Sequence, residues 1–255
     1  MKRYVALLVA ALALAGCGTT KRAEPTTPTT TVTPTTTPAP RTCAAGLRPL
    51  GSARRAYVGL AASGAVAYRV PGGTVEARFG AKNVNDYPTL FGVVGKVVGR
   101  DCAARWYRVQ LPMRPNGAIG YVRAEELDIE TVSARIVVDV SARTLTLYRG
   151  GHKVFAATVA VGSPATPTPT GRYYVNQRLI PDDTAGPFGP AAIGISAFSN
   201  VLTGWTQGGP VAIHGTNEPW SIGHAVSNGC VRLPNATLNR LFRVAVAGTP
   251  VIIRA

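Results

Sequence analysis

The stretch IHGTNEPWSIGHAVSNGCVRL, from Ile213 to Leu233, decides how the rest of this chain is interpreted, its fold included. It contains His214 and Cys230, sixteen residues apart. A cysteine reacts as its thiolate, and a neighbouring base promotes loss of the thiol proton. Gly229 lets the backbone turn tightly beside the thiol, so that successive N–H groups can converge on a developing oxyanion. Arg232 offers a bidentate grip on a carboxylate. The stretch therefore predicts acyl transfer through a cysteine.

The order and spacing of these residues resemble the signature of the L,D-transpeptidases, enzymes of the YkuD fold that crosslink bacterial peptidoglycan. In that family a His-Gly pair precedes a segment that reads Ser-His-Gly-Cys, an apolar residue and Arg. Here the matching positions are His214-Gly215 and the segment from Ser227 to Arg232. Asn228 stands where the family usually has histidine. This departure leaves the expected base, His214, in place.

The resemblance implies a mechanism without a metal or an organic cofactor. A thiolate attacks a peptidoglycan stem peptide, and a histidine moves the proton. The roles that it implies are nucleophile for Cys230, base for His214, orientation of the imidazole for Gly215, an oxyanion hole around Asn228 and Gly229, and substrate binding for Ser227 and Arg232.

Other segments agree with this family, and the resemblance covers residues 133–255. The stretch 135–162 alternates apolar and polar residues around Arg149-Gly150-Gly151, which predicts a β-hairpin. Asn235 is expected to cap a short helix with an apolar stripe, and Gly248 to follow its C-terminal end. Residues 251–253 predict a final strand. The expected fold class is mostly β, with one short helix in a YkuD-type catalytic domain.

The N-terminal residues predict export rather than a fold. Lys2 and Arg3 precede a short apolar stretch, and residues 14–17 read Leu-Ala-Gly-Cys, which resembles a bacterial lipobox. We expect residues 1–17 to be a lipoprotein signal peptide with lipidation at Cys17; an ordinary secretory signal is the alternative. Residues 18–42 form a predicted linker, because 14 of the 16 residues from Pro25 to Pro40 are Thr or Pro.

Between the linker and the catalytic part, residues 56–129 predict a small β domain. Its clearest piece is the stretch from Trp106 to Val122, two β-rich runs around a turn that contains Pro and Gly. This hairpin resembles the last strands of bacterial SH3-like barrels. Tyr107 and Tyr121 then have two interpretations, as stacking surfaces for a glycan or peptide, or as core residues of a spacer domain.

The four cysteines divide into three expected roles. With Cys17 as the anchor and Cys230 as the nucleophile, Cys43 and Cys102 remain, and in an oxidising compartment such a pair is expected to form a disulfide. Zinc is a competing use for Cys230 with His214 and His224. The chain lacks the CxxC and HExxH spacings that are typical of zinc sites.

The charge of the chain favours anionic partners. It has 27 basic and 12 acidic residues, a formal net charge of +15. The basic residues are scattered, so we expect anionic wall polymers, stem peptides and a membrane reached through the lipid anchor rather than nucleic acid. The expected location is outside the cytoplasm, facing the cell wall. A carboxypeptidase, a wall-protein attachment enzyme, an unrelated cysteine peptidase and a non-catalytic wall-binding lipoprotein remain as alternatives.

Overall fold

A computed structural model describes residues 42–255 of the chain. The predicted signal peptide, the lipidation at Cys17 and all but the last residue of the predicted linker lie outside the described residues. The described residues all belong to one compact unit. Within the described part, no helix is both long enough and apolar enough to cross a bilayer.

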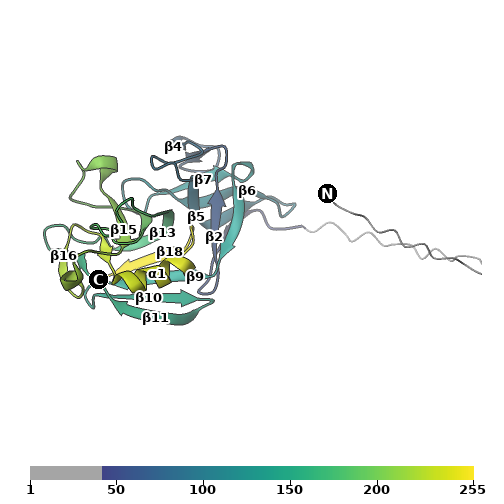
Figure 1. Ribbon diagram of the computed structural model, residues 1–255. Coiled ribbons are helices and arrows are strands. Elements are labelled where there is room, and N and C mark those ends of the chain that lie inside the picture. Colours follow the sequence, from purple (N-terminus) through teal and green to yellow (C-terminus); the bar gives the residue numbers. More distant parts are fainter. Residues whose placement is uncertain (1–41) are drawn as a thin grey trace, which may run out of the picture. The chain divides into compact units, whose positions relative to one another are not determined.

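The first half of the described chain forms an eight-stranded antiparallel sheet (Figure 1). Seven strands follow the order β4-β3-β7-β6-β5-β2-β8, and the remaining strand, β1, pairs with β5. The strands are β1 (Gly46–Pro49), β2 (Ala56–Leu60), β3 (Ala65–Tyr68), β4 (Val75–Phe79), β5 (Leu90–Val98), β6 (Ala104–Gln110), β7 (Ile119–Arg123) and β8 (Asp128–Val132), with a 3-10 turn η1 (Ala124–Glu126). The predicted hairpin of residues 106–122 is present as β6 and β7.

The second half forms a mixed eight-stranded sheet in the order β11-β10-β9-β18-β13-β14-β15-β17. Its strands are β9 (Ala134–Asp139), β10 (Thr144–Arg149), β11 (His152–Thr158), β13 (Gly171–Leu179), β14 (Ala192–Phe198), β15 (Pro210–His214), β17 (Val231–Arg232) and β18 (Pro250–Arg254). A separate parallel pair joins β12 (Val161–Gly162) to β16 (Ala225–Ser227). The helical elements are α1 (Asn235–Val244) and the 3-10 turns η2 (Thr206–Gly208) and η3 (Pro219–Ser221).

The mostly β fold class with one short α-helix is confirmed. The predicted hairpin around Gly150 and Gly151 is present as β10 paired with β11. Alternate residues of β10, such as Leu145 and Leu147, are fully buried, which explains the apolar–polar alternation of its sequence. The predicted final strand is β18. It lies inside the sheet, parallel to β9 and antiparallel to β13.

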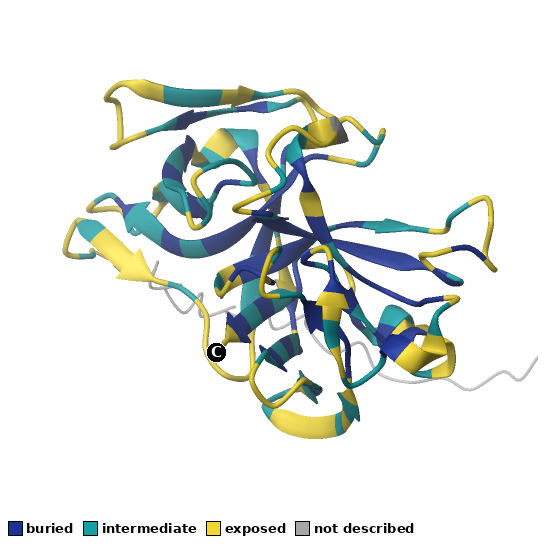
Figure 2. Ribbon diagram, turned by 90° about the vertical axis from the view of Figure 1, so that its left-hand side faces the viewer, coloured by how far each residue is buried: buried dark blue, intermediate teal, exposed yellow. Residues whose placement is uncertain are grey.

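The larger hydrophobic core of the described chain is formed mainly by the second sheet and α1, and Figure 2 shows buried positions in dark blue. On β15, Val211 and Ile213 point into this core. The apolar stripe of α1, with Leu238 and Leu241 fully buried, covers part of the same core. The other residues of β15 are therefore free to face the opposite side of the sheet.

The expectation that Asn235 caps this helix is wrong. Pro234 occupies the N-cap position, and Asn235 is the first residue of α1 with no capping bond to the helix. Instead, its side-chain Oδ1 accepts a hydrogen bond of 2.8 Å from the amide of Thr216. The carboxamide of Asn235 therefore holds the loop after β15 and does not cap the helix.

Side chains of the two sheets pack directly against each other. The hydroxyl of the fully buried Tyr174 donates a hydrogen bond of 2.9 Å to the carbonyl of Leu90. Gly248, after the helix, has a φ of +82°, and a Cβ at this position would lie 2.4 Å from the Cβ of Val58. Glycine is therefore required there both by the backbone conformation and by the approach of β2.

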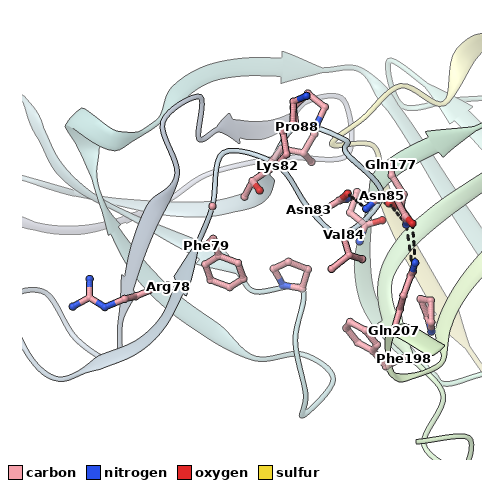
Figure 3. Close-up of a pocket in the computed structure, with 16 residues that line it drawn as sticks. Arg78, Phe79, Lys82, Asn83, Val84, Asn85, Pro88, Gln177, Phe198 and Gln207 are labelled. Carbon is pink, nitrogen blue, oxygen red and sulfur yellow. Dashed lines mark hydrogen bonds between the residues drawn. The ribbon is translucent and has the colours of Figure 1, made fainter. Parts of the chain in front are cut away.

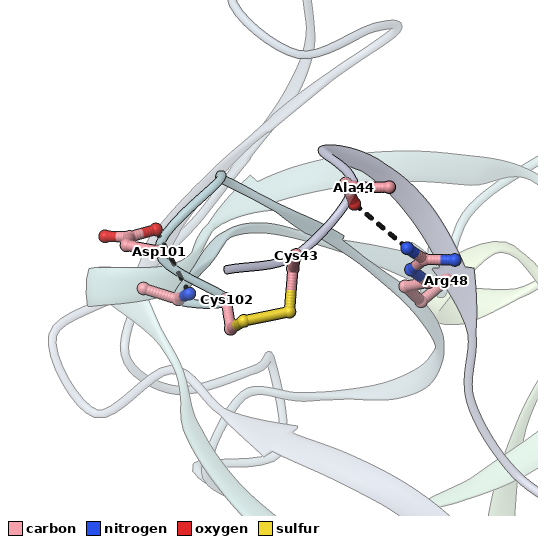
Figure 4. The surroundings of a disulfide bond; sticks show 6 residues. Cys43, Ala44, Arg48, Asp101 and Cys102 are labelled. Carbon is pink, nitrogen blue, oxygen red and sulfur yellow. Dashed lines mark hydrogen bonds between the residues drawn. A yellow bond between two sulfur atoms is a disulfide. The ribbon is translucent and has the colours of Figure 1, made fainter. Parts of the chain in front are cut away.

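A disulfide links the start of the described chain to the first sheet (Figure 4). It joins Cys43 to Cys102, whose Cα atoms lie 5.1 Å apart and whose positions are separated by 59 in the sequence. The backbone amide of Cys43 also donates to the carbonyl of Arg100. The disulfide therefore ties β1, which follows Cys43, to the loop between β5 and β6.

We predict that replacing both Cys43 and Cys102 with serine lowers the free energy of unfolding by about 4 kcal/mol, because the unfolded chain regains the entropy of an open loop. Denaturant titration of the oxidised protein and of the double variant measures this loss. The Cys230→Ser variant, which leaves the disulfide intact, is the control. Equal stability of the double variant and the wild type would contradict the prediction, as would alkylation of both thiols in the oxidised protein.

Candidate active site

Strand β15 carries the candidate base to the end of the sheet. It lies between β14 and β17, and His214 is its last residue. Because side chains alternate along a strand, His214 and Ala212 share the face opposite the core residues Val211 and Ile213. Only 4% of the surface of His214 is exposed. The imidazole is therefore held in a nearly closed environment.

One hydrogen bond fixes the orientation of the imidazole. The Nδ1 atom of His214 lies 2.6 Å from the carbonyl oxygen of Gly215. Since a carbonyl only accepts, Nδ1 carries a proton, and in the neutral ring Nε2 is left as an acceptor. The ring of Phe188 packs edge-on against the imidazole, with a centroid distance of 5.0 Å. Gly215 thus lies where the sequence analysis expected an orienting carbonyl.

The backbone around Gly215 is itself held from two sides. A Cβ on Gly215 would lie 2.3 Å from the Oδ1 of Asn235, and a Cβ on Gly189 would lie 2.8 Å from the Cα of Gly215. Asn235 bonds to the next amide, that of Thr216. The sequence analysis missed this function of Asn235, because the residue type is equally typical of a helix cap. Both glycines are needed for this close approach.

Cys230 lies against the same strand. Its thiol is free and half-buried, and its Sγ accepts a hydrogen bond of 3.4 Å from the amide of Ala212. Ala212 precedes His214 by two residues on one face of β15, and β17 pairs in parallel with this strand directly after Cys230. The fold therefore brings the sulfur and the imidazole, which are far apart in the sequence, to one end of the sheet.

A tight turn of residues 227–230 presents the thiol. Gly229 has a φ of +110°, and its amide donates a hydrogen bond of 3.1 Å to the hydroxyl of Ser227. This hydroxyl in turn donates a hydrogen bond of 2.5 Å to the carbonyl of Cys230. Ser227 is buried, so in this structure its hydroxyl holds the turn instead of facing a substrate. The amide of Gly229 is occupied as well, whereas neither the Asn228 nor the Cys230 amide donates a hydrogen bond within residues 42–255.

Arg232 has a protein partner that the sequence analysis did not identify. Its guanidinium forms an ion pair with Glu218, and the Arg232 side chain is only 18% exposed. The backbone amide of Glu218 donates a hydrogen bond of 2.9 Å to the hydroxyl of Thr216. Glu218 lies in the segment between the two halves of the motif, so its acidic character was visible, but its pairing with Arg232 depends on the folded path of that segment.

The surroundings favour the uncharged forms of both candidate catalytic groups. Burial lowers the pKa of His214 to about 4; the charge of Arg232 acts in the same direction, and the hydrogen bond to Gly215 opposes it. Burial raises the pKa of the Cys230 thiol, against the smaller lowering effects of the Ala212 amide and of Arg232. The resting pair is therefore a thiol beside a neutral imidazole.

The remaining histidine candidate is placed differently. His224 is exposed in the loop before β16, and its carbonyl accepts a hydrogen bond of 3.1 Å from the amide of Val161. The pairing of β12 with β16 holds this loop. Among residues 42–255, no three His, Cys, Asp or Glu side chains gather into a group suited to a metal ion.

The lowered pKa of His214 predicts a specific dependence of stability on pH. An unfolded histidine titrates near 6.5, so between pH 6.5 and about 4 the unfolded chain binds the proton that the folded chain does not. This contribution is fully present above pH 6.5, and about 3 kcal/mol of it is lost as the pH falls to 4. Denaturant titrations at pH 4 and pH 6.5 measure the free energy of unfolding. Between these two pH values, His214→Gln should lose less of it than the wild type does, by this amount. An identical loss in the two proteins would mean that the folded imidazole is protonated.

Comparison with known proteins places this geometry in one family. Residues 133–253 match the model of the YkuD L,D-transpeptidase catalytic domain. The YkuD protein of Bacillus subtilis is 36% identical over 126 residues, which cover 49% of this chain and 69% of that protein. The YkuD protein of Bacillus licheniformis is 36% identical over 124 residues, which cover 49% and 67%.

Among solved structures, an Enterococcus faecium L,D-transpeptidase variant is 25% identical with a TM-score of 0.36. The match covers 48% of this chain and 49% of that one, so the chain spans about half the length of the solved protein. The residues that match the family model, 133–253, contain nearly all of β9 to β18 and both His214 and Cys230. On the family model and the Bacillus relatives, this chain belongs to the YkuD family of L,D-transpeptidases.

Proposed function

We propose that this protein is a peptidoglycan L,D-transpeptidase that crosslinks stem peptides through a thioester on Cys230. The observation that carries the proposal is the position of the half-buried thiol. It is hydrogen-bonded to the amide of Ala212, two residues before a histidine whose Nδ1 is fixed and whose Nε2 can accept a proton. A nucleophile, a base and an orienting group in this order are the minimal machinery for acyl transfer.

The first half-reaction forms the thioester. The sulfur of Cys230 attacks the carbonyl carbon of the L-centred residue, meso-diaminopimelate in the usual stem, that precedes a terminal D-alanine. A C–S bond forms as the thiol proton passes to Nε2 of His214. Collapse of the tetrahedral intermediate breaks the C–N bond, and the imidazolium returns the proton to the amine of the departing D-alanine. The imidazole is neutral again, as its lowered pKa favours.

The turn at residues 227–230 supplies the oxyanion hole in this proposal. The amides of Asn228 and Cys230 are the donors, while the Gly229 amide, bonded to Ser227, holds the shape of the turn. One such donor is typically worth about 2.7 to 4 kcal/mol of transition-state stabilisation. Asn228 takes part through its backbone, so the replacement of the family's usual histidine by asparagine does not remove this function.

The second half-reaction transfers the acyl group to the side-chain amine of another stem. His214 accepts a proton from this amine, a C–N bond forms and the C–S bond breaks, which regenerates the thiol. Water in place of the amine gives carboxypeptidase activity, and an amine on a wall protein gives attachment. The nucleophile site is the same in all three reactions, so the acceptor decides between them.

Arg232 and Glu218 suggest how a stem carboxylate is recognised. Glu218 occupies the guanidinium in this structure, and its side chain is 45% exposed. A substrate carboxylate would replace Glu218 at Arg232 by exchanging one charge-assisted pair for another. The proposed cellular setting is the outer face of the membrane, with the protein anchored through Cys17 and the first sheet as a domain that approaches the wall.

If Cys230 is the nucleophile, incubation of the full chain with a carbapenem should add the mass of one drug molecule, since ring opening by the thiol loses no atoms. Intact-protein mass spectrometry measures the adduct. Cys230→Ala should give none, whereas the Cys43→Ser and Cys102→Ser double variant retains the reactive thiol and should react. An adduct that persists in Cys230→Ala would remove this residue from its assigned role.

The two histidines near the motif should respond differently to substitution. His214→Ala should slow acylation by 100-fold or more, because general-base assistance contributes about that factor. His224→Ala is the matched variant, and it should mainly change substrate affinity, because His224 lies in the loop before β16. Stopped-flow acylation with circular dichroism as the folding control measures both. An equal collapse of acylation in the two folded variants would contradict the assignment of the base.

A further inference from the structure

A second cavity lies between the two sheets, outside the site just described (Figure 3). Its volume is about 330 Å³. One wall is the segment 78–90 of the first sheet, which includes the connection from β4 to β5, and the other comes from β13, β14, η2 and β15. The cavity is therefore built by both halves of the described chain.

The lining of this cavity is rich in carboxamides. The Nδ2 atoms of Asn83 and Asn85 donate to Oε1 of Gln177, at 3.0 and 2.9 Å. The Nε2 of Gln207 donates 2.8 Å to Oδ1 of Asn85. A carboxamide both donates and accepts, as a peptide group does, so a wall of this kind is suited to an extended peptide. A neutral peptide backbone needs this alternation of donors and acceptors.

One polar atom of the lining has no partner. The Oδ1 of Asn176 is buried and makes no hydrogen bond within the described protein. A β-bulge between Val175 and Gln177 places the side chains of both Asn176 and Gln177 over Gly194, where a Cβ would lie 3.1 Å from that oxygen. A buried acceptor without a partner costs free energy, and a hydrogen-bond donor on a bound ligand would remove this cost.

One residue of the cavity lining, Gln177, shares a face of the second sheet with Ala212. Gln177 lies opposite Gly194, which lies opposite Ala212, the residue whose amide bonds to the sulfur of Cys230. Cross-strand partners share one face of a sheet. Pro210 lines the cavity, and at about 3.3 Å per residue it lies about 7 Å along β15 from Ala212.

We propose that this cavity binds the acyl side of the donor stem, the peptide that stays attached to Cys230 in the thioester. This inference rests on the proposed function. His214 must meet the departing amine and later the acceptor amine, so both belong at the C-terminal end of β15. The retained peptide then runs the other way along the strand, toward Pro210 and the carboxamides of the cavity.

The test measures the affinity of a soluble tetrapeptide stem that ends in meso-diaminopimelyl-D-alanine, by calorimetric titration of the full chain in the Cys230→Ala background. Asn176→Leu keeps the branched shape of four side-chain heavy atoms and removes the unpartnered oxygen, so the dissociation constant should rise about tenfold while the thermal midpoint does not fall. Val84→Trp, at a lining residue that is 79% exposed, should fill the cavity and raise the constant at least as much. Val154→Trp, on β11 and 47% exposed, is the matched control and should bind as the parent does.

The outcomes separate this inference from the proposed function. Unchanged tetrapeptide affinity in both cavity variants, or an equal loss in Val154→Trp, would overturn the cavity as a donor site, while the carbapenem adduct on wild-type Cys230 would still stand. Failure of wild type to form that adduct would instead contradict the nucleophile. The affinity measurement does not need the thiol, so it tests the cavity as a donor site whether or not Cys230 is the nucleophile.

Discussion

The parallel pairing of β15 with β17 is the constraint on which the site depends. It sets Ile213 beside Val231 and His214 beside Arg232, and so leaves Cys230 at the edge of the sheet with its sulfur on the amide of Ala212. Two parallel strands need a crossover between them, and here the crossover is the loop that also holds Glu218 and His224. The same pairing that sets the position of Cys230 relative to His214 therefore requires this loop. A shift of one residue would turn the imidazole into the core.

Electrostatics and packing act together at this point. Burial stabilises the uncharged thiol and the uncharged imidazole, and the charge of Arg232 disfavours the imidazolium further. Arg232 is not left as an isolated buried charge, because Glu218 pairs with it. An uncharged Cys230 thiol reacts slowly with oxidants and metals, since the thiolate is the reactive form.

Much of this arrangement was predictable from local patterns, and the failures have a common cause. The hairpins, the short helix and the association of His214 with Cys230 follow from alternation, apolar stripes and motif spacing, which are properties of neighbouring residues. The functions of Asn235 and Glu218 depend on partners that the folded chain brings to them, Thr216 in one case and Arg232 in the other. The carboxamides of the cavity lie on segments about ninety residues apart, as the pairs Asn83–Gln177 and Asn85–Gln177 show. The periodicity of residues within one segment cannot predict a contact between two such distant segments.

The place of β18 in the second sheet has a consequence for how the chain folds. This strand lies between β9 and β13, and Val251 pairs with Ile136, more than a hundred residues earlier. Until β18 has left the ribosome, the hairpin of β10 and β11 with β9 has no hydrogen-bonded connection to the strands that carry His214. The sheet must therefore assemble after synthesis of nearly all its residues, through contacts of long sequence separation, which makes folding slow and leaves open strand edges in the meantime. In a nascent chain of this topology, the second sheet therefore stays incomplete until its last strand is available.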